Sequence, residues 1–198
     1  MKYDYDYFVS AARVGKQAPR FEMPVVLPHA ESSQRISTIR LDQLLNEGFW
    51  VVLYFYPMDF TFVCPTEIKR FNELNDAFET KKAKLIAIST DSVYSHLNWQ
   101  ASSLGNLNHY HASDQTHKVS EAYGVLEESL GVAWRGTFII APSGILKSIS
   151  IQHGEAGRNV DDVLRTLEVF QNEVIGKMVP CNWQPGQPFI DNNKNNKK

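Results

Sequence analysis

The sequence predicts a layered α/β domain in which a central mixed β-sheet is flanked by helices. Apolar runs rich in β-branched and aromatic residues recur along the chain, as expected of strands buried on both faces. Between and after them, apolar residues recur at three- and four-residue spacing, as in amphipathic helices. The 198-residue length and 43% hydrophobic content fit one domain whose core needs no disulfide or metal to fold.

Four segments supply the expected sheet. Residues 49–55 form a continuous apolar run, and 84–89 and 136–140 are similar. The turn sequence of residues 141–144, Ala-Pro-Ser-Gly, joins the third run to residues 145–151. These last two strands therefore form a predicted hairpin.

The predicted helices follow the strands. Pro65 precedes apolar residues at helical spacing up to Phe78, and a second such series runs from Val160 to Val174. Further helices are expected over 93–104 and 118–123. Alternating strands and helices that end in a hairpin and a closing helix indicate a layered α/β domain, in the order found in thioredoxin-like proteins.

The two ends differ in composition from the middle. We expect an N-terminal extension over residues 1–12, the α/β domain over 13–175 and a C-terminal arm over 176–198. Residues 190–198 are almost entirely polar, so we expect them to be disordered.

Charge and hydropathy exclude several classes of partner. The net charge of −2 gives no reason to expect binding to nucleic acid or to an anionic membrane. No run approaches the roughly 18 to 20 apolar residues of a membrane span. The first eight residues include Asp4 and Asp6 where a signal peptide would be basic, and no long apolar run follows, so we expect a cytoplasmic protein.

The chain has two cysteines, Cys64 and Cys181. They could be unrelated buried thiols, a structural bridge or a redox pair. A zinc site would also need histidines, and His109 and His111 are the one close pair in the sequence. We expect no metal, and we interpret 109–111 as an ordinary exposed or strand segment.

Cys64 stands where a buried strand gives way to a helix that begins near Pro65. A cysteine acts as a nucleophile in its thiolate form. Keeping the thiolate at neutral pH requires roughly 3 to 4 kcal/mol of stabilisation, whereas a helix N-terminus typically supplies about 0.3 to 1 kcal/mol. A reactive Cys64 therefore needs a cation, which we expect to be an arginine. The residues alone leave open the alternative of a buried, inert cysteine.

Residues 55–67 (Phe-Tyr-Pro-Met-Asp-Phe-Thr-Phe-Val-Cys-Pro-Thr-Glu) resemble the active-site signature of typical 2-Cys peroxiredoxins, the group that includes the alkyl hydroperoxide reductase peroxidase subunit. The resemblance extends from about residue 13 to residue 189. Its further matches are 89–92, 96–99, 123–125, 134–140, 157–158 and 179–186.

The resemblance implies a thioredoxin-like fold with a C-terminal extension, and an antioxidant peroxidase that reduces hydrogen peroxide and organic hydroperoxides. Cys64 would be the peroxidatic cysteine and would form a sulfenic acid. Cys181 would be the resolving cysteine, supplied by the partner subunit to make an intersubunit disulfide. Thioredoxin or a flavoprotein disulfide reductase would then reduce that disulfide.

The resemblance also assigns supporting residues. Thr61 would orient the peroxide and the thiolate, and Pro57 would shield the sulfur from water. Arg135 would hold both thiolate and peroxide, which makes it the expected cation. Glu67 and Arg158 would position Arg135. Taken singly, each has a simpler interpretation as a loop residue, a surface charge or an acidic residue in a first helical turn.

The resemblance further implies a homodimer, assembling to a decamer, with no cofactor and no metal. Peroxide-sensitive members carry a Gly-Gly-Leu-Gly loop and a C-terminal Tyr-Phe, whereas this chain has Ser-Ser-Leu-Gly at 102–105 and no Tyr-Phe near its end. We therefore expect resistance to overoxidation.

Three rival functions remain. The first is a thioredoxin-type oxidoreductase, which would need a thiol at the position of Glu67. The others are a holdase and a protein with a structural disulfide.

Overall fold

The computed structural model describes residues 12–28 and 35–191. The expected N-terminal extension, except Ala12, and the polar tail from residue 192 lie outside the described residues. The described chain divides into two compact units, one ending at Arg158 and the other beginning at Asn159. The domain boundaries expected at residues 12/13 and 175/176 stay predictions.

The first unit contains most of the secondary structure. Its strands are β1 (Glu22–Val26), β2 (Ile36–Arg40), β3 (Trp50–Phe55), β4 (Ala83–Ser89), β5 (Tyr110–Ser113), β6 (Leu126–Glu127), β7 (Val132–Ala133), β8 (Arg135–Ile140) and β9 (Leu146–Gln152). Its helices are α1 (Leu41–Asn46), α2 (Cys64–Glu73), α3 (Asn75–Thr80), α4 (Val93–Trp99), a π-helix (Gln100–Leu104) and α5 (Lys118–Ala122). The second unit contains α6 (Val160–Val174).

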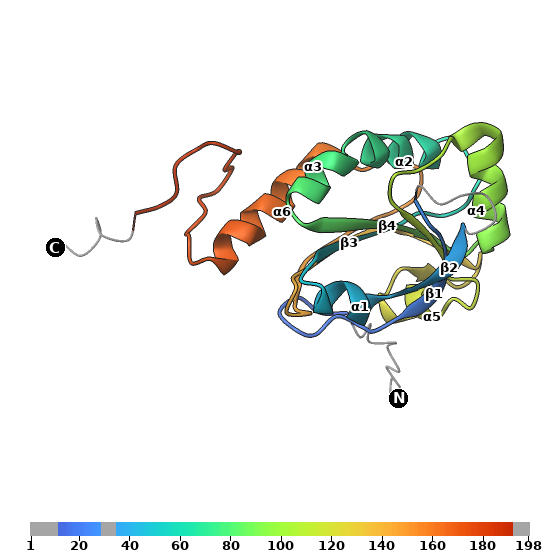
Figure 1. Ribbon diagram of the computed structural model, residues 1–198, viewed down its shortest axis with the longest axis horizontal. Coiled ribbons are helices and arrows are strands. Elements are labelled where there is room, and N and C mark those ends of the chain that lie inside the picture. The colour runs from blue at the N-terminus through green and yellow to red at the C-terminus, as the bar shows by residue number, and fades with distance from the viewer. Residues whose placement is uncertain (1–11, 29–34, 192–198) are drawn as a thin grey trace, which may run out of the picture. The chain divides into compact units, whose positions relative to one another are not determined.

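Seven of the strands form one mixed sheet in the order β2-β1-β5-β4-β3-β8-β9. β3, β4 and β5 run parallel, and the other neighbours pair antiparallel. Figure 1 shows α2, α3 and α4 on one side of this sheet and α1 and α5 on the other. The predicted layered α/β architecture with a central mixed sheet is confirmed.

β3 occupies the middle of the sheet, between β4 and β8. All six of its residues are buried, which explains why its sequence is apolar throughout instead of alternating. β8 pairs with β9 through the predicted hairpin. Gly136 in β8 is required by close packing, since a Cβ there would lie 2.6 Å from a methyl group of Val125.

Two predicted helices are interrupted in the structure. The helix expected from Pro65 to Phe78 breaks at Leu74, whose backbone (φ −92°, ψ 2°) leaves the helical region, so that α2 and α3 are separate helices. The helix expected over 93–104 is α-helical only to Trp99 and continues as the π-helix. Hydrophobic periodicity survives both changes, and it could not reveal them.

Residues 109–111, for which we expected an exposed segment or a strand, are only partly as expected. Residues 110 and 111 begin β5, so the expected strand is confirmed there. His109 and His111 are only 3% and 0% exposed. The expectation of an exposed segment was wrong because β5 lies inside the sheet, between β1 and β4.

The second unit begins with a capped helix. The side chain of Asn159 accepts a hydrogen bond from the backbone N–H of Asp162 at the start of α6. Further on, Trp183 is buried and its indole N–H donates to the carbonyl of Gln187. Ile190 pairs with Met178 in an isolated β-bridge, so the expectation of disorder does not hold at residue 190. No helix among the described residues is long and apolar enough to cross a membrane.

Candidate active site

Cys64 is the first residue of α2 and follows a loop, residues 57–63, that leaves the end of β3. Pro65 occupies the first turn of the helix, where a missing N–H costs nothing. Only 1% of Cys64 is exposed, so its sulfur depends on neighbouring side chains more than on water for any charge that it carries. The N-terminal end of α2 favours negative charge at this position.

Arg135 approaches the sulfur from β8, of which it is the first residue. One guanidinium nitrogen, Nη1, donates to Cys64 Sγ at 3.4 Å, and Nε donates to the carbonyl of Gly154 at 3.0 Å. The arginine is itself buried. The cation that the sequence argument required is thus within hydrogen-bonding distance of the sulfur.

Glu67, one turn along α2, links this arginine to Arg158. It accepts from Arg135 Nη1 at 2.6 Å and from Arg158 Nε at 2.9 Å, one arginine on each carboxylate oxygen. Arg158 also donates to the carbonyls of Phe55 and Gly136, at the ends of β3 and β8. Burial lowers the pKa of Arg158, and the charge of Glu67 opposes that shift. The three side chains form a buried ionic network with a net positive charge beside Cys64.

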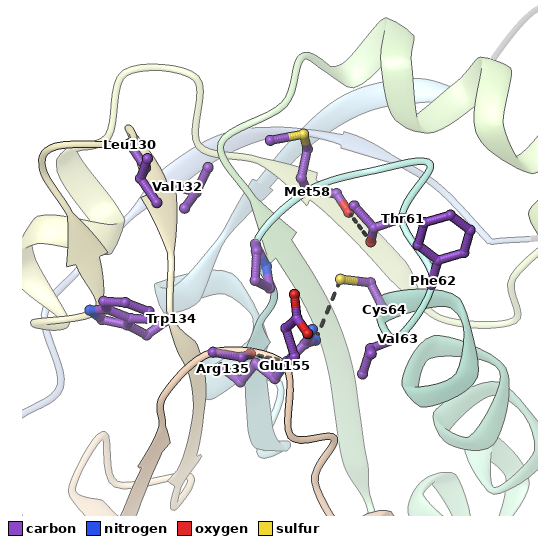
Figure 2. Close-up of a pocket in the computed structure, with 12 residues that line it drawn as sticks. Met58, Thr61, Phe62, Val63, Cys64, Leu130, Val132, Trp134, Arg135 and Glu155 are labelled. Carbon is purple, nitrogen blue, oxygen red and sulfur yellow. Dashed lines mark hydrogen bonds between the residues drawn. The ribbon is translucent and has the colours of Figure 1, made fainter.

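The sulfur faces a cavity of about 480 Å³ (Figure 2). Its lining includes four of the residues singled out in the sequence: Pro57, Thr61, Cys64 and Arg135. The other lining residues are mostly apolar: Met58, Phe62, Val63, Leu130, Val132, Trp134, Gly154 and Glu155. Figure 2 shows the apolar side chains of Leu130, Val132 and Trp134 across the cavity from the loop that carries Thr61. An apolar wall with a few convergent polar groups is typical of a site for a small ligand.

Thr61 also lines this cavity, and its hydroxyl donates to the carbonyl of Met58 at 3.0 Å. With its hydrogen engaged, the oxygen keeps its lone pairs for accepting a hydrogen bond from a bound molecule. The structure thus brings Cys64, Thr61, Pro57 and Arg135 into one cavity, and Glu67 and Arg158 directly behind it.

Cys181 belongs to the second unit, and its environment is different. It is an exposed free thiol, and Cys64 is also free. It sits in the turn before Asn182, which adopts a positive φ of 57°.

A buried polar cluster that the sequence did not reveal contacts the same loop. It consists of Tyr56, Asp59, His96 and His111, each less than 5% exposed. One signal could have pointed to it: His96 shares helical spacing with the buried residues Val93 and Trp99 of α4, which puts it on the inward face.

Comparison with known proteins places the chain in a family. Residues 14–149 match the model of the AhpC/TSA family. The chain is 43% identical to the peroxiredoxin tpx1 of Schizosaccharomyces pombe over 185 residues, which covers 90% of this chain and 93% of that protein. It is equally 43% identical to the thioredoxin peroxidase of Echinococcus granulosus over 182 residues, covering 89% of this chain and 91% of that protein. The reduced 2-Cys peroxiredoxin of Plasmodium vivax has a similar structure, with a TM-score of 0.82, 35% identity and coverage of 89% and 91%. The chain therefore belongs to the AhpC/TSA family, the family of the peroxiredoxins.

Proposed function

We propose that this protein is a thiol peroxidase that reduces hydrogen peroxide and organic hydroperoxides through Cys64, and so serves antioxidant defence. The observation that carries the proposal is the guanidinium of Arg135 at 3.4 Å from the buried Cys64 sulfur, inside a cavity large enough for a peroxide. The named relatives, a peroxiredoxin and a thioredoxin peroxidase, support the same activity.

In the first step the Cys64 thiolate attacks one oxygen of the peroxide. The S–O bond forms as the O–O bond breaks, and the leaving oxygen departs as hydroxide or alkoxide and takes up a proton to become water or an alcohol. Sulfur is oxidised to the sulfenic acid and the peroxide is reduced. Arg135 is placed to stabilise charge on the leaving oxygen, as donors do in an oxyanion hole. Thr61 would accept a hydrogen bond from the peroxide and so orient it.

In the second step the sulfenic acid condenses with the thiol of Cys181 and releases water. The exposure of Cys181 suits a thiol that must meet a sulfur on another chain. In this proposal the disulfide joins two subunits. Its formation requires the first turn of α2 to unwind, because a sulfur only 1% exposed cannot reach bonding distance in place. A dithiol reductant then restores both thiols by exchange.

The remaining residues have supporting roles in this proposal. Glu67 fixes the direction of the Arg135 guanidinium, and Arg158 fixes Glu67. Pro57 lines the cavity and limits access of water to the sulfur. The chemistry uses no cofactor and no metal, because the two sulfurs carry the electrons.

Thioredoxin is the reductant that the relatives favour, with a flavoprotein disulfide reductase as the alternative. We place the protein in the cytoplasm as a homodimer that assembles to a decamer. Large apolar side chains exposed on the loop before Cys64 support an assembled state, since Phe60 is 57% and Phe62 94% exposed.

A coupled assay tests the function. The protein, thioredoxin, thioredoxin reductase and NADPH should consume hydrogen peroxide catalytically, and the Cys64→Ser variant should not. A flavoprotein reductase with NADH in place of thioredoxin identifies the donor. After peroxide treatment a non-reducing gel should show a covalent dimer, which the Cys181→Ser variant cannot form. A monomer band from the wild-type protein would show an intrachain bridge and overturn the intersubunit step.

Resistance to overoxidation is tested by mass spectrometry during turnover at millimolar peroxide. Cys64 should remain mostly in the disulfide and thiol forms, because Cys181 captures the sulfenic acid before a second peroxide does. Rapid accumulation of sulfinic acid at Cys64 would contradict the expectation drawn from residues 102–105.

A further inference from the structure

The loop that presents Cys64 has a strained backbone. Between β3 and α2 the chain passes through Phe60, a non-glycine residue at φ 57°. A left-handed conformation costs such a residue roughly 1 to 2 kcal/mol. A loop with that cost holds one conformation only where neighbouring contacts fix it.

Asp59, next to Phe60, is the residue that is fixed. Its carboxylate accepts from Tyr56 Oη at 2.6 Å, from Ser95 Oγ at 2.7 Å and from a ring nitrogen of His96 at 2.8 Å. Its backbone N–H donates to Asp91 Oδ2 at 2.9 Å. The side chain and the backbone N–H of Asp59 are thus hydrogen-bonded to residues at the end of β3, in α4 and in the segment after β4.

The hydrogens of this cluster can be assigned from its geometry. Nδ1 of His96 lies 2.8 Å from Asp59 Oδ2 and its Nε2 lies 3.1 Å from the carbonyl of Ala112, so both ring nitrogens face an acceptor. The amide of Gln100 donates to His111 Nδ1 at 3.0 Å, which leaves His111 Nε2 to donate to the oxygen of Tyr56 at 2.5 Å. The two imidazoles stack at 3.9 Å.

A metal site is the obvious alternative, because one ligand atom each of Asp59, His96 and His111 lie within 4.8 Å of one another. The hydroxyl of Tyr56, however, bridges Asp59 and His111 at 2.6 and 2.5 Å and occupies the space between them. Every potential ligand atom already has a partner within the protein. The cluster is therefore a closed hydrogen-bond network.

We propose that Asp59, held by Tyr56, Ser95 and His96, is a clamp that keeps the Cys64 loop in its peroxide-reactive conformation and opposes the unwinding needed for disulfide formation. The four residues are positioning residues, since none of them lines the cavity that Cys64 faces. The inference rests on the proposed function. It predicts opposite changes in the two chemical steps: a weaker clamp slows attack on peroxide and accelerates resolution by Cys181.

Tyr56→Phe is the sharpest test, because it removes one hydroxyl and leaves the ring. The hydroxyl binds both Asp59 and His111, and of these two bonds the one to Asp59 holds the loop. Loss of that bond, about 1 kcal/mol, should accelerate disulfide formation by about 5-fold. Peroxide attack should slow by a smaller factor, because the folded loop remains the majority state. Stopped-flow tryptophan fluorescence with rapid-quench mass spectrometry measures both steps. Sulfinic acid formed per turnover should fall by the same factor of about 5 as resolution gains.

Tyr123→Phe is the matched control. Tyr123 is also a buried aromatic residue of the first unit, and its hydroxyl donates to the carbonyl of Pro19, away from the loop. It should lose comparable stability without changing the ratio of the two rates. Ser95→Ala, which removes another donor to Asp59, is a second and milder variant that should change the ratio in the same direction as Tyr56→Phe.

The outcomes separate the two proposals. A wild-type protein that forms neither the sulfenic acid nor the disulfide refutes the proposed function. A wild-type protein that forms both, with Tyr56→Phe and Ser95→Ala resolving no faster than Tyr123→Phe, refutes the clamp alone. A fall of both rates together in the clamp variants would also refute it, since that is the result of general destabilisation.

Discussion

The two cysteines of this protein have contrasting surroundings. Cys64 is 1% exposed, begins a helix and touches a guanidinium held by a buried carboxylate. Cys181 is exposed and stands in a turn. That turn still has local structure around it, because the rings of Trp183 and Phe189 stack with their centroids 5.6 Å apart. The Cys64 thiol is thus buried beside charged side chains, and the Cys181 thiol is exposed on a short segment that has its own packing.

The two environments suit the two roles proposed for these cysteines. A thiol that attacks a small molecule benefits from a buried site that supplies charge and excludes water. A thiol that must meet a second sulfur benefits from access. Four predictions test the contrast between these two environments.

The largest effect is expected from Glu67→Gln. The substitution keeps the shape of the side chain but leaves the guanidiniums of Arg135 and Arg158 buried without their counter-charge. We expect a loss of about 3 to 5 kcal/mol in the free energy of unfolding. Chemical denaturation measures it. The matched control is Glu73→Gln in the same helix, whose exposed pair with Arg70 should contribute less than about 1 kcal/mol. Equal losses in the two variants would show that the buried network stabilises the fold no more than an exposed ion pair does.

The second effect separates the two thiols directly. Arg135→Met removes the guanidinium and keeps much of the side-chain volume. The rate of Cys64 oxidation by peroxide should fall by a factor on the order of 10² to 10³, the usual effect of removing one preorganised donor. Alkylation of Cys181 in the same molecules should keep its rate, and it serves as the internal control. A parallel fall at both cysteines would point to unfolding instead.

The third effect is a histidine-dependent pH response confined to the first unit, because all six histidines precede residue 159. Burial lowers the pKa of His109 to about 3 from an ordinary value of 6.5. The unfolded chain therefore binds the proton first, and stability present above pH 6.5 is lost as the pH falls toward 3. Between pH 7 and pH 5 this single group should cost about 2 kcal/mol.

Denaturation of His109→Gln at the two pH values checks this expectation. The variant should lose about 2 kcal/mol less than the wild type between pH 7 and pH 5. His153→Gln, at an exposed position, is the control and should behave like the wild type. An unchanged acid response in His109→Gln would contradict the assignment of a buried neutral imidazole.

The smallest effect compares one helix cap in each unit. Asn159 caps α6, and Ser92 caps α4. Replacing either with alanine should cost about 1 kcal/mol. Hydrogen exchange should then accelerate in α6 for Asn159→Ala and in α4 for Ser92→Ala. Acceleration in both helices from either change would show that the two units unfold together.

The sheet was predictable because its strands carry strong local signals. The apolar run of β3 and the turn before β9 are visible in the sequence, since burial on two faces and tight turns each demand particular residue types. The breaks at Leu74 and at the π-helix were not predictable. Both preserve the apolar face of the helix, and hydrophobic periodicity reports only that face.

The site was predictable in a different way. The position of Cys64 before Pro65 indicated a helix start, and the need for a cation followed from thiolate chemistry. That the cation is Arg135, from a strand 71 positions away, came from the family resemblance. The cluster around Asp59 was missed because its members come from three separate segments, and only the folded chain brings them together.

The π-helix has a consequence for how this protein could change by insertion or deletion. Its backbone closes with a bond from the N–H of Gly105 to the carbonyl of Gln100, one residue longer than an α-helical turn. Deleting a single residue between 101 and 103 would let that turn relax to ordinary α geometry. The same deletion would rotate the buried Leu104, at the end of this turn, by about 100° around the helix axis relative to α4. The number of residues in this one turn thus decides whether Leu104 remains buried, whatever those residues are.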